Sequence, residues 1–208
     1  MTTAPPLDLA EFRLVRALRA REGEGPFTQL WNAQAGHLWS VVRGVVRSDA
    51  EALGWLASFR IDLAEEAASF NLEEALGAQV GRALYRHLRD GLPPGSQLPA
   101  SRLPPTPEGV AVLPPRVRLG YLVDIFFDWT PPDPAVRTAY RLLEPAADTN
   151  ARLVVYAACL RSPPVEALIF PPGLPPRPPA PPAKRRISLL IAAAGGALIL
   201  AVLAWSLH

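Results

Sequence analysis

Residues 27–46 read FTQLWNAQAGHLWSVVRGVV, and this stretch decides the predicted fold. Its apolar residues recur every three or four positions, which places them on one face of an α-helix. Gly23 and Pro26 break any helix that precedes it. Ser48 or Asp49 follows, and the side-chain oxygen of either residue can cap the start of the next helix. The apolar face consists of Phe27, Leu30, Trp31, Leu38, Trp39, Val42 and Val46.

The helical spacing continues on both sides of this stretch and predicts an all-α fold. An upstream helix is expected to bury Leu9, Phe12, Val15 and Leu18. The next helix downstream is expected to bury Leu53, Leu56, Phe59 and Leu63. Asn71 is predicted to cap a further helix, whose inner stripe would be Leu72, Ala75, Leu76, Val80, Leu84 and Leu88. Three more helices are expected at 117–127, 134–143 and 149–160, although residues 117–127 are apolar enough to suit a strand as well.

The C-terminal residues 187–207 read ISLLIAAAGGALILAVLAWSL, without a charged side chain. A helix of this length, rising about 1.5 Å per residue, spans the hydrocarbon core of a bilayer, roughly 30 Å. Lys184, Arg185 and Arg186 stand immediately before it, and positive residues favour the cytoplasmic side. No apolar run near the N-terminus has the pattern of a signal peptide. The sequence therefore predicts a single-pass, tail-anchored protein with the lipid bilayer as one partner and residues 1–186 in the cytoplasm.

Proline divides the remaining chain into predicted domains. Of 25 prolines, ten lie between Pro163 and Pro182, and proline fixes φ and lacks an N–H, so this stretch favours an extended spacer. Residues 165–170 (VEALIF) interrupt the spacer and are a candidate docking segment. The predicted parts are a helical domain at 1–90, a Pro-rich linker at 91–115, a second helical domain at 116–162, a juxtamembrane linker at 163–186 and the membrane helix at 187–207.

Residue types and charge exclude several classes of function. One cysteine and three scattered histidines give neither a disulfide framework nor a metal-ligand cluster, so no metal or cofactor is expected. A glycine-rich phosphate loop and a nucleophile elbow are both missing, and we expect no enzyme. Residues 1–90 hold ten arginines and twelve acidic residues, so phosphate binding would require segregated arginines. Arg82, Arg86 and Arg89 do fall on one face of a predicted helix.

The order of several short motifs resembles bacterial sigma factors of the extracytoplasmic-function type. Residues 27–31 (FTQLW), then the apolar helix and residues 48–53 (SDAEAL), resemble the opening helices of that family's second conserved region. Residues 84–90 (LYRHLRD) are similar to its promoter-melting and minus-ten helix. Residues 113–118 (LPPRVR) look like the start of its fourth region.

Together with the predicted membrane anchor, this resemblance implies a membrane-tethered transcription regulator at the bacterial inner membrane, with RNA polymerase and promoter DNA as partners. The residues expected to meet DNA phosphates are Arg82, Arg86 and Arg89. The residues expected on the polymerase-facing helix are Asp49, Glu51 and Trp55. An anti-sigma factor or an envelope protein would be a further partner.

Three departures from the family's pattern leave a second interpretation open. Ala52 stands where the family has the second aspartate of its D-A-E-D motif, and Trp55 and Leu56 replace its Q-E pair. Residues 128–134 (DWTPPDP) place prolines where the first helix of a helix-turn-helix pair should run. The alternative is a tail-anchored helical adaptor that recruits a protein partner to the inner membrane without binding DNA.

Overall fold

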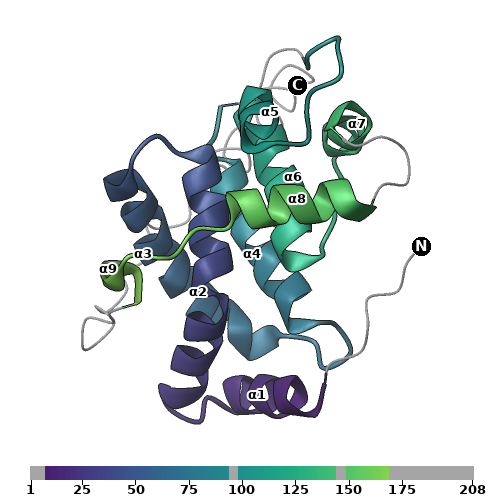
Figure 1. Cartoon of the computed structure of the whole chain (residues 1–208). Coiled ribbons are helices and arrows are strands. Elements are labelled where there is room, and N and C mark those ends of the chain that lie inside the picture. The colour runs from purple at the N-terminus through teal and green to yellow at the C-terminus, as the bar shows by residue number, and fades with distance from the viewer. Residues whose placement is uncertain (1–7, 94–97, 144–148, 169–208) are drawn as a thin grey trace, which may run out of the picture. The chain divides into compact units, whose positions relative to one another are not determined.

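Helices provide all the regular secondary structure in the part of the chain that the computed structural model describes, which is residues 8–93, 98–143 and 149–168. This confirms the all-α prediction for those residues. The elements are α1 (Leu9–Ala20), α2 (Gly25–Val45), α3 (Asp49–Glu66), a 3₁₀ turn η1 (Ala67–Ser69), α4 (Leu76–Arg89), α5 (Pro107–Val112), α6 (Pro115–Phe127), α7 (Pro134–Leu143), α8 (Thr149–Cys159) and α9 (Val165–Leu168) (Figure 1).

Local capping chemistry sets the start of α3 as predicted. The Ser48 hydroxyl oxygen accepts a hydrogen bond from the Glu51 backbone N–H at 3.2 Å. The Glu51 carboxylate reaches back and accepts from the Arg47 backbone N–H at 3.1 Å. This arrangement resembles a capping box shifted by one residue: the Ser48 bond satisfies one of the N–H groups that a helix start leaves open, and the Glu51 bond fixes the residue before the cap. The predicted bounds of α6, α7 and α8 are also confirmed to within two residues.

The start of α4 differs from the prediction that Asn71 caps it. The Asn71 carboxamide oxygen accepts from the Glu73 backbone N–H at 3.0 Å, which closes a local turn, and the helix begins only at Leu76. The buried Gln79 side chain holds this turn in place. Its Nε2 donates to the carbonyl oxygens of Asn71 and Glu74, each at 2.8 Å, and its Oε1 accepts from the Asn71 N–H.

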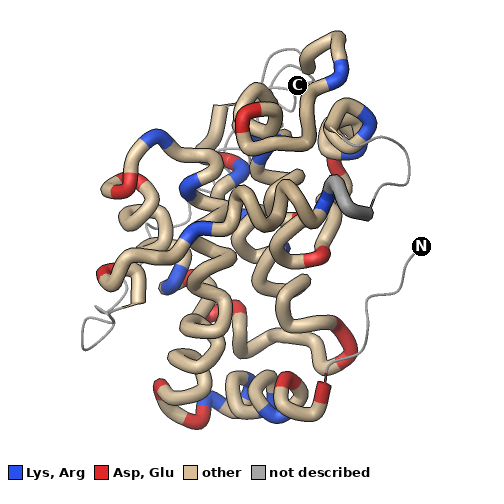
Figure 2. Tube along the Cα trace, viewed as in Figure 1, with Lys and Arg blue, Asp and Glu red and all other residues tan. Residues whose placement is uncertain are grey.

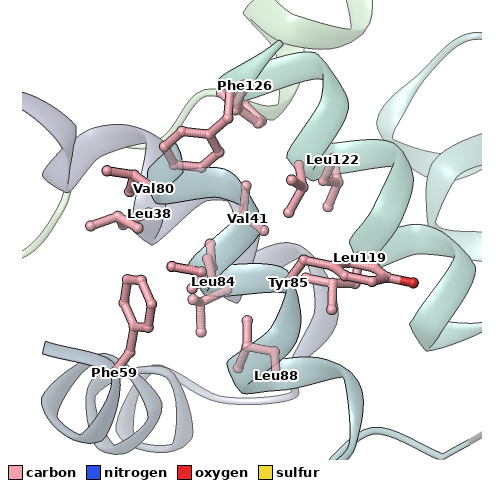
Figure 3. Packing of buried hydrophobic residues seen from close by; sticks show 14 of the residues in the cluster. Leu38, Val41, Phe59, Val80, Leu84, Tyr85, Leu88, Leu119, Leu122 and Phe126 are labelled. Atoms are coloured by element: carbon pink, nitrogen blue, oxygen red, sulfur yellow. The ribbon is translucent and has the colours of Figure 1, made fainter. Parts of the chain in front are cut away.

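Helix α6 lies in the middle of the core and joins the two predicted helical domains. Ten of its 13 residues are buried, and α2, α4 and α7 pack against it. A helix that is apolar on all sides must be surrounded by other elements, so it cannot lie at the edge of a small separate bundle. The described residues of both regions therefore share one hydrophobic cluster. The contacts drawn in Figure 3 include Leu38 and Val41 of α2, Val80 and Leu84 of α4, and Leu119 and Leu122 of α6.

The stretch 91–115, predicted to be a linker, contributes to the same core. It contains α5, and the side chains of Val110 and Leu113 are buried. The backbone N–H of Leu103 donates to the carbonyl oxygen of Leu142 at 2.9 Å, which fastens the stretch to the end of α7. The buried apolar residues of this stretch therefore belong to the same hydrophobic cluster as those of α6.

Close packing of α4 on α6 depends on the absence of a side chain at Gly81. A Cβ at this position would lie 2.5 Å from Phe127 Cβ and 3.2 Å from Val123 Cγ1. The Cβ of Phe127 is fixed by the backbone of α6, so rotation of the phenyl ring cannot relieve the contact. The separation of these two helices is therefore set by glycine at this point.

Helix α1 buries only the second half of its predicted apolar stripe. Val15 and Leu18 are buried, as expected, but Leu9 is 66% exposed and Phe12 is 39% exposed. The prediction is wrong for these two residues because α1 packs against η1 and α2, which cover only its later turns.

Residues 160–168, which we call the strap, lead from α8 back to α2. The Ser40 hydroxyl oxygen, buried in α2, accepts from the Arg161 backbone N–H at 2.8 Å. The indole N–H of Trp31 donates to the carbonyl oxygen of Ala167 in α9 at 3.0 Å, and α9 packs against α2 and α3. The first residues of the predicted juxtamembrane linker are thus fixed on the helical core, as the apolar interruption in that linker suggests.

His37 of α2 lies in an aromatic pocket beneath α8. Its ring is 5.6 Å from that of Phe126 between centroids, and its Nε2 is 3.0 Å from the Tyr156 hydroxyl oxygen. Burial lowers the pKa of His37 below its ordinary value of 6.5. The unfolded chain therefore binds a proton at His37 more readily than the folded chain does, and stability falls as the pH drops below 6.5.

We expect the free energy of unfolding to decrease between pH 7.5 and pH 5.5, with His37 contributing at most about 1.4 kcal/mol per pH unit. Chemical denaturation of the detergent-solubilised chain at both pH values measures the decrease. The variant His37→Gln keeps a polar side chain that does not titrate, so its decrease should be smaller by the contribution of His37. An equal decrease in both proteins would show that the acid sensitivity arises elsewhere.

The predicted membrane helix at 187–207 and its flanking residues Lys184, Arg185 and Arg186 lie outside the described residues. Within the described part, no helix is both long and apolar enough to cross a bilayer.

Candidate functional site

The three arginines predicted to contact DNA lie on α4, and a carboxylate accompanies each of them. The pairs are Arg82–Glu74, Arg86–Glu66 and Arg89–Asp90, the last with Nε 3.0 Å from Oδ1. We call the surface formed by these residues, together with Ser58, Asp62 and His87, the α3–α4 surface. Figure 2 shows basic and acidic positions interspersed along the helices. The arginines share a helix face as predicted, but the surface that contains them carries both signs of charge.

A polar cleft of about 270 Å³ opens on this surface between the end of α3 and the start of α4. Its walls include the Arg82–Glu74 and Arg86–Glu66 pairs, with the Asn71 turn at one side. Gln79 supports that turn from below, so the cleft has a fixed polar wall. Both guanidinium and carboxylate groups line the opening, which suits a ligand that offers both donors and acceptors.

Ser58, His87 and Asp62 form a hydrogen-bonded chain that links α3 to α4. The Ser58 hydroxyl oxygen is 3.0 Å from His87 Nε2, and His87 Nδ1 is 2.8 Å from the Asp62 carboxylate. These are the contacts of a nucleophile, a base and an orienting acid. Ser58 lies within α3, however, where backbone N–H groups are used in helix hydrogen bonds and are not aimed at a substrate. We interpret these three hydrogen-bonded side chains as a polar link that fixes α4 on α3.

The residues predicted to face the polymerase lie around the start of α3 and serve local structure. Asp49 pairs with Arg43 of α2, with Oδ1 2.5 Å from Nε. Glu51 completes the cap of α3. Trp55 is half-buried and packs its ring edge-on against His87, with centroids 5.6 Å apart. Asp49 and Glu51 are exposed and near each other, whereas Trp55 belongs to the α3–α4 contact.

The two arginines of the LPPRVR stretch bind backbone carbonyl groups of other segments. Arg116 Nε donates to the carbonyl oxygen of Leu92 at 2.8 Å. Arg118 donates to the carbonyl oxygen of Gly44, at the end of α2, at 3.1 Å. Its guanidinium also donates to Ala111 at 2.5 Å and to Leu113 at 2.8 Å. Burial lowers the pKa of Arg118 from its ordinary value. This motif therefore ties α6 to α2 and α5.

Asp124 of α6 is buried, and protein side chains satisfy its carboxylate. Thr130 donates to Oδ1 at 2.6 Å, and an Arg152 guanidinium nitrogen lies 3.2 Å from Oδ2. Burial raises the pKa of Asp124, while the Thr130 hydrogen bond and the Arg152 charge oppose the increase. Within the described residues no cluster of three potential metal ligands is found. Asp124 and Asp128 share a helix face, and Arg152 contacts both of them.

Sequence reasoning missed the acidic side of the α3–α4 surface. Ser58 and Asp62 have the i, i+4 spacing that places two residues on one helix face, which is a usable signal. The pairing of Glu66 with Arg86 and of Glu74 with Arg82 carries no such signal, because it depends on how α3, α4 and their connection pack.

Comparison of the chain with models of protein families, with curated proteins and with solved structures gave no match.

Proposed function

We propose that the chain is a tail-anchored helical adaptor, held at the cytoplasmic face of the bacterial inner membrane by residues 187–207, that recruits a protein partner without binding DNA. The pairing of Arg82, Arg86 and Arg89 with nearby carboxylates carries this proposal. Affinity for DNA comes mainly from cations that neutralise phosphates. A phosphate approaching these arginines would also meet their carboxylate partners, and this repulsion offsets the attraction.

The positions of Arg116 and Arg118 give further support. Both side chains donate to backbone carbonyl groups, and the guanidinium of Arg118 makes several such bonds, so Arg118 would have to give up these contacts to bind a phosphate. The resemblance of the LPPRVR stretch to the start of a DNA-binding region is consistent with a motif that stabilises the fold and does not itself contact DNA.

The chemistry of the α3–α4 surface favours a protein partner. Its charges of both signs can pair with charges of a partner, and the cleft of about 270 Å³ can receive one polar side chain of that partner. Protein interfaces commonly combine such complementary charges with a central pocket. The adaptor would act by presenting this surface at the membrane, with no catalytic step.

A sigma-factor-like regulator is the second candidate, and the exposure of two arginines favours it. The side chains of Arg86 and Arg89 are 57% and 49% exposed on the same face of α4. Surface ion pairs are weak, typically below about 1 kcal/mol, so phosphates can compete for an exposed arginine. In this interpretation α4 would contact DNA, and the start of α3 would contact RNA polymerase.

DNA binding by the full chain in nanodiscs distinguishes the two candidates. We expect the combined substitution of Arg82, Arg86 and Arg89 by alanine to leave the affinity for duplex DNA and its salt dependence unchanged, as measured by fluorescence anisotropy. The matched control removes the same charge from α1 by substituting Arg13, Arg16 and Arg19, which are exposed. A loss of affinity and a shallower salt slope for the α4 variant alone would favour the sigma-like candidate.

Crosslinking identifies the partner directly. A photoreactive amino acid in place of Arg86 should capture a specific protein in cells, and Glu66→Lys together with Glu74→Lys should abolish the capture. Glu22→Lys, at an exposed position after α1, is the control and should retain it. Capture of an RNA polymerase subunit would contradict the adaptor proposal and support the alternative.

A further inference from the structure

Large exposed apolar side chains gather on the last described part of the chain. On α8 and the residue after it, Leu153 is 60% exposed, Val154 is 54% exposed and Leu160 is 46% exposed. Ala157 and Ala158 between them are also exposed. We call these five residues the α8 face. The adjoining α5 adds Val112, which is 57% exposed, and the strap adds Val165 and Leu168.

The inner side of α8 is fixed on the core, so the α8 face is its outward side. Val155 is buried, Tyr156 bonds to His37, and Arg152 bonds to Asp124 of α6. Figure 1 shows α8 crossing in front of α2 and α6. The face spans residues 153–160 without a charged side chain, and charge returns at Arg161. A helix with one anchored side and one apolar side exposed to water indicates a surface that is covered by something else.

The shape of this face favours a planar apolar environment. The exposed residues lie on the outer side of a single helix that packs on the core. Exposed apolar side chains on one side of a helix can insert at the boundary between lipid headgroups and acyl chains. Residues 187–207, with their uncharged sequence, indicate that a bilayer is close to this part of the chain.

The connection to that predicted anchor is short enough to bring the α8 face to the membrane. Because α9 is fixed on α2, only residues 169–186 separate the described part from the anchor. Even fully extended in polyproline II form, at about 3.1 Å per residue, they reach no more than roughly 56 Å. A connection of this length keeps the α8 face within reach of the bilayer, so a weak apolar contact with the membrane is favoured by proximity.

We propose that the α8 face lies in the headgroup region of the bilayer in which residues 187–207 are anchored, so that the helical core rests on the membrane in a defined orientation. This inference rests on the membrane anchorage in the proposed function. It predicts that the orientation of the core is set by two membrane contacts, the anchor and the α8 face.

Quenching of a fluorescent probe by brominated lipid tests the proposal with the full chain in phosphatidylcholine and phosphatidylglycerol vesicles. Cys159→Ala removes the native thiol, and Val154→Cys then carries an environment-sensitive probe. Ala57→Cys, at an exposed position of α3, carries the same probe as the control. We expect brominated acyl chains to reduce the fluorescence at position 154 at least twofold and that at position 57 by less than a tenth.

A second variant separates this contact from the anchor. The probe is placed at Ala158→Cys, and its quenching is compared with and without the additional substitution Leu153→Glu. We expect Leu153→Glu to remove most of the quenching, while the chain still floats with vesicles after carbonate treatment. Flotation without quenching at position 154 would overturn the proposal and leave the anchor intact. If the probe there were also shielded from aqueous iodide, a second copy or residues 187–207 would cover the face. Failure to float would contradict the anchorage and this contact together.

Discussion

Gly81→Ala is expected to lower the free energy of unfolding by about 2 kcal/mol, although alanine is the better helix former. The new Cβ would lie 2.5 Å from Phe127 Cβ, so α4 and α6 must move apart. Overpacking of this kind typically costs about 1–3 kcal/mol, occasionally more, whereas the gain in helix propensity is at most about 1 kcal/mol. Because the contacts of α6 with α4 and with α2 are the two most extensive in the described fold, the loss affects the whole fold.

Gly54→Ala provides the matched control for this prediction. Gly54 lies inside α3, is exposed, and has no heavy atom within 4 Å of the position a Cβ would take. The same change should therefore raise the free energy of unfolding by about 0.5–1 kcal/mol. Chemical denaturation of both variants measures the difference of about 3 kcal/mol. Two variants of equal stability would show that α4 and α6 do not approach as closely as described.

Arg118→Met is expected to lower the free energy of unfolding by about 3 kcal/mol. The methionine fills part of the space but leaves the carbonyl groups of Gly44, Ala111 and Leu113 without their charged donor. A hydrogen bond to a charged group contributes about 1.5–3 kcal/mol, and leaving the partly buried carbonyl groups of Gly44 and Leu113 unpaired adds a desolvation cost. Several bonds to one side chain are not additive, so the total stays well below their sum.

The comparison for Arg118 is Arg102→Met, which removes the same charge from an exposed position before α5. Stability should change there by less than about 0.5 kcal/mol. The loss of stability for Arg118→Lys should lie between those of the two methionine variants, because an ammonium group can reach one carbonyl but not all three. If Arg118→Met and Arg102→Met were equally mild, the LPPRVR stretch would not be the structural link described above.

The helices were predictable from sequence where one local rule decides them. The spacing of apolar residues in 27–46 gives α2, and the oxygen of Ser48 gives the start of α3. The sequence could not show that α6 joins the two halves, since an apolar stretch such as VRLGYLVDIFF does not reveal which neighbours surround it. The start of α4 was missed for a similar reason, because the turn at Asn71 is stabilised by Gln79, eight residues later.

Only the basic residues of the candidate site could be predicted from the sequence. The shared face of Arg82, Arg86 and Arg89 follows from helical spacing, but their charge partners do not. Glu66 and Arg86 are 20 residues apart and meet only because α3 and α4 pack together. An inference of phosphate binding from spacing alone therefore overlooks the acidic half of the same surface.

The docking of α9 also determines how the protein responds to mechanical load. Tension applied through residues 169–186 reaches the fold at α9, where the hydrogen bond between Trp31 and Ala167 and the bond between Ser40 and Arg161 bear it in turn. We expect these two bonds to break before α8 leaves the core, because α8 is held by further contacts with α6 and His37. The nine residues of the strap would then extend while the rest of the described fold stays intact.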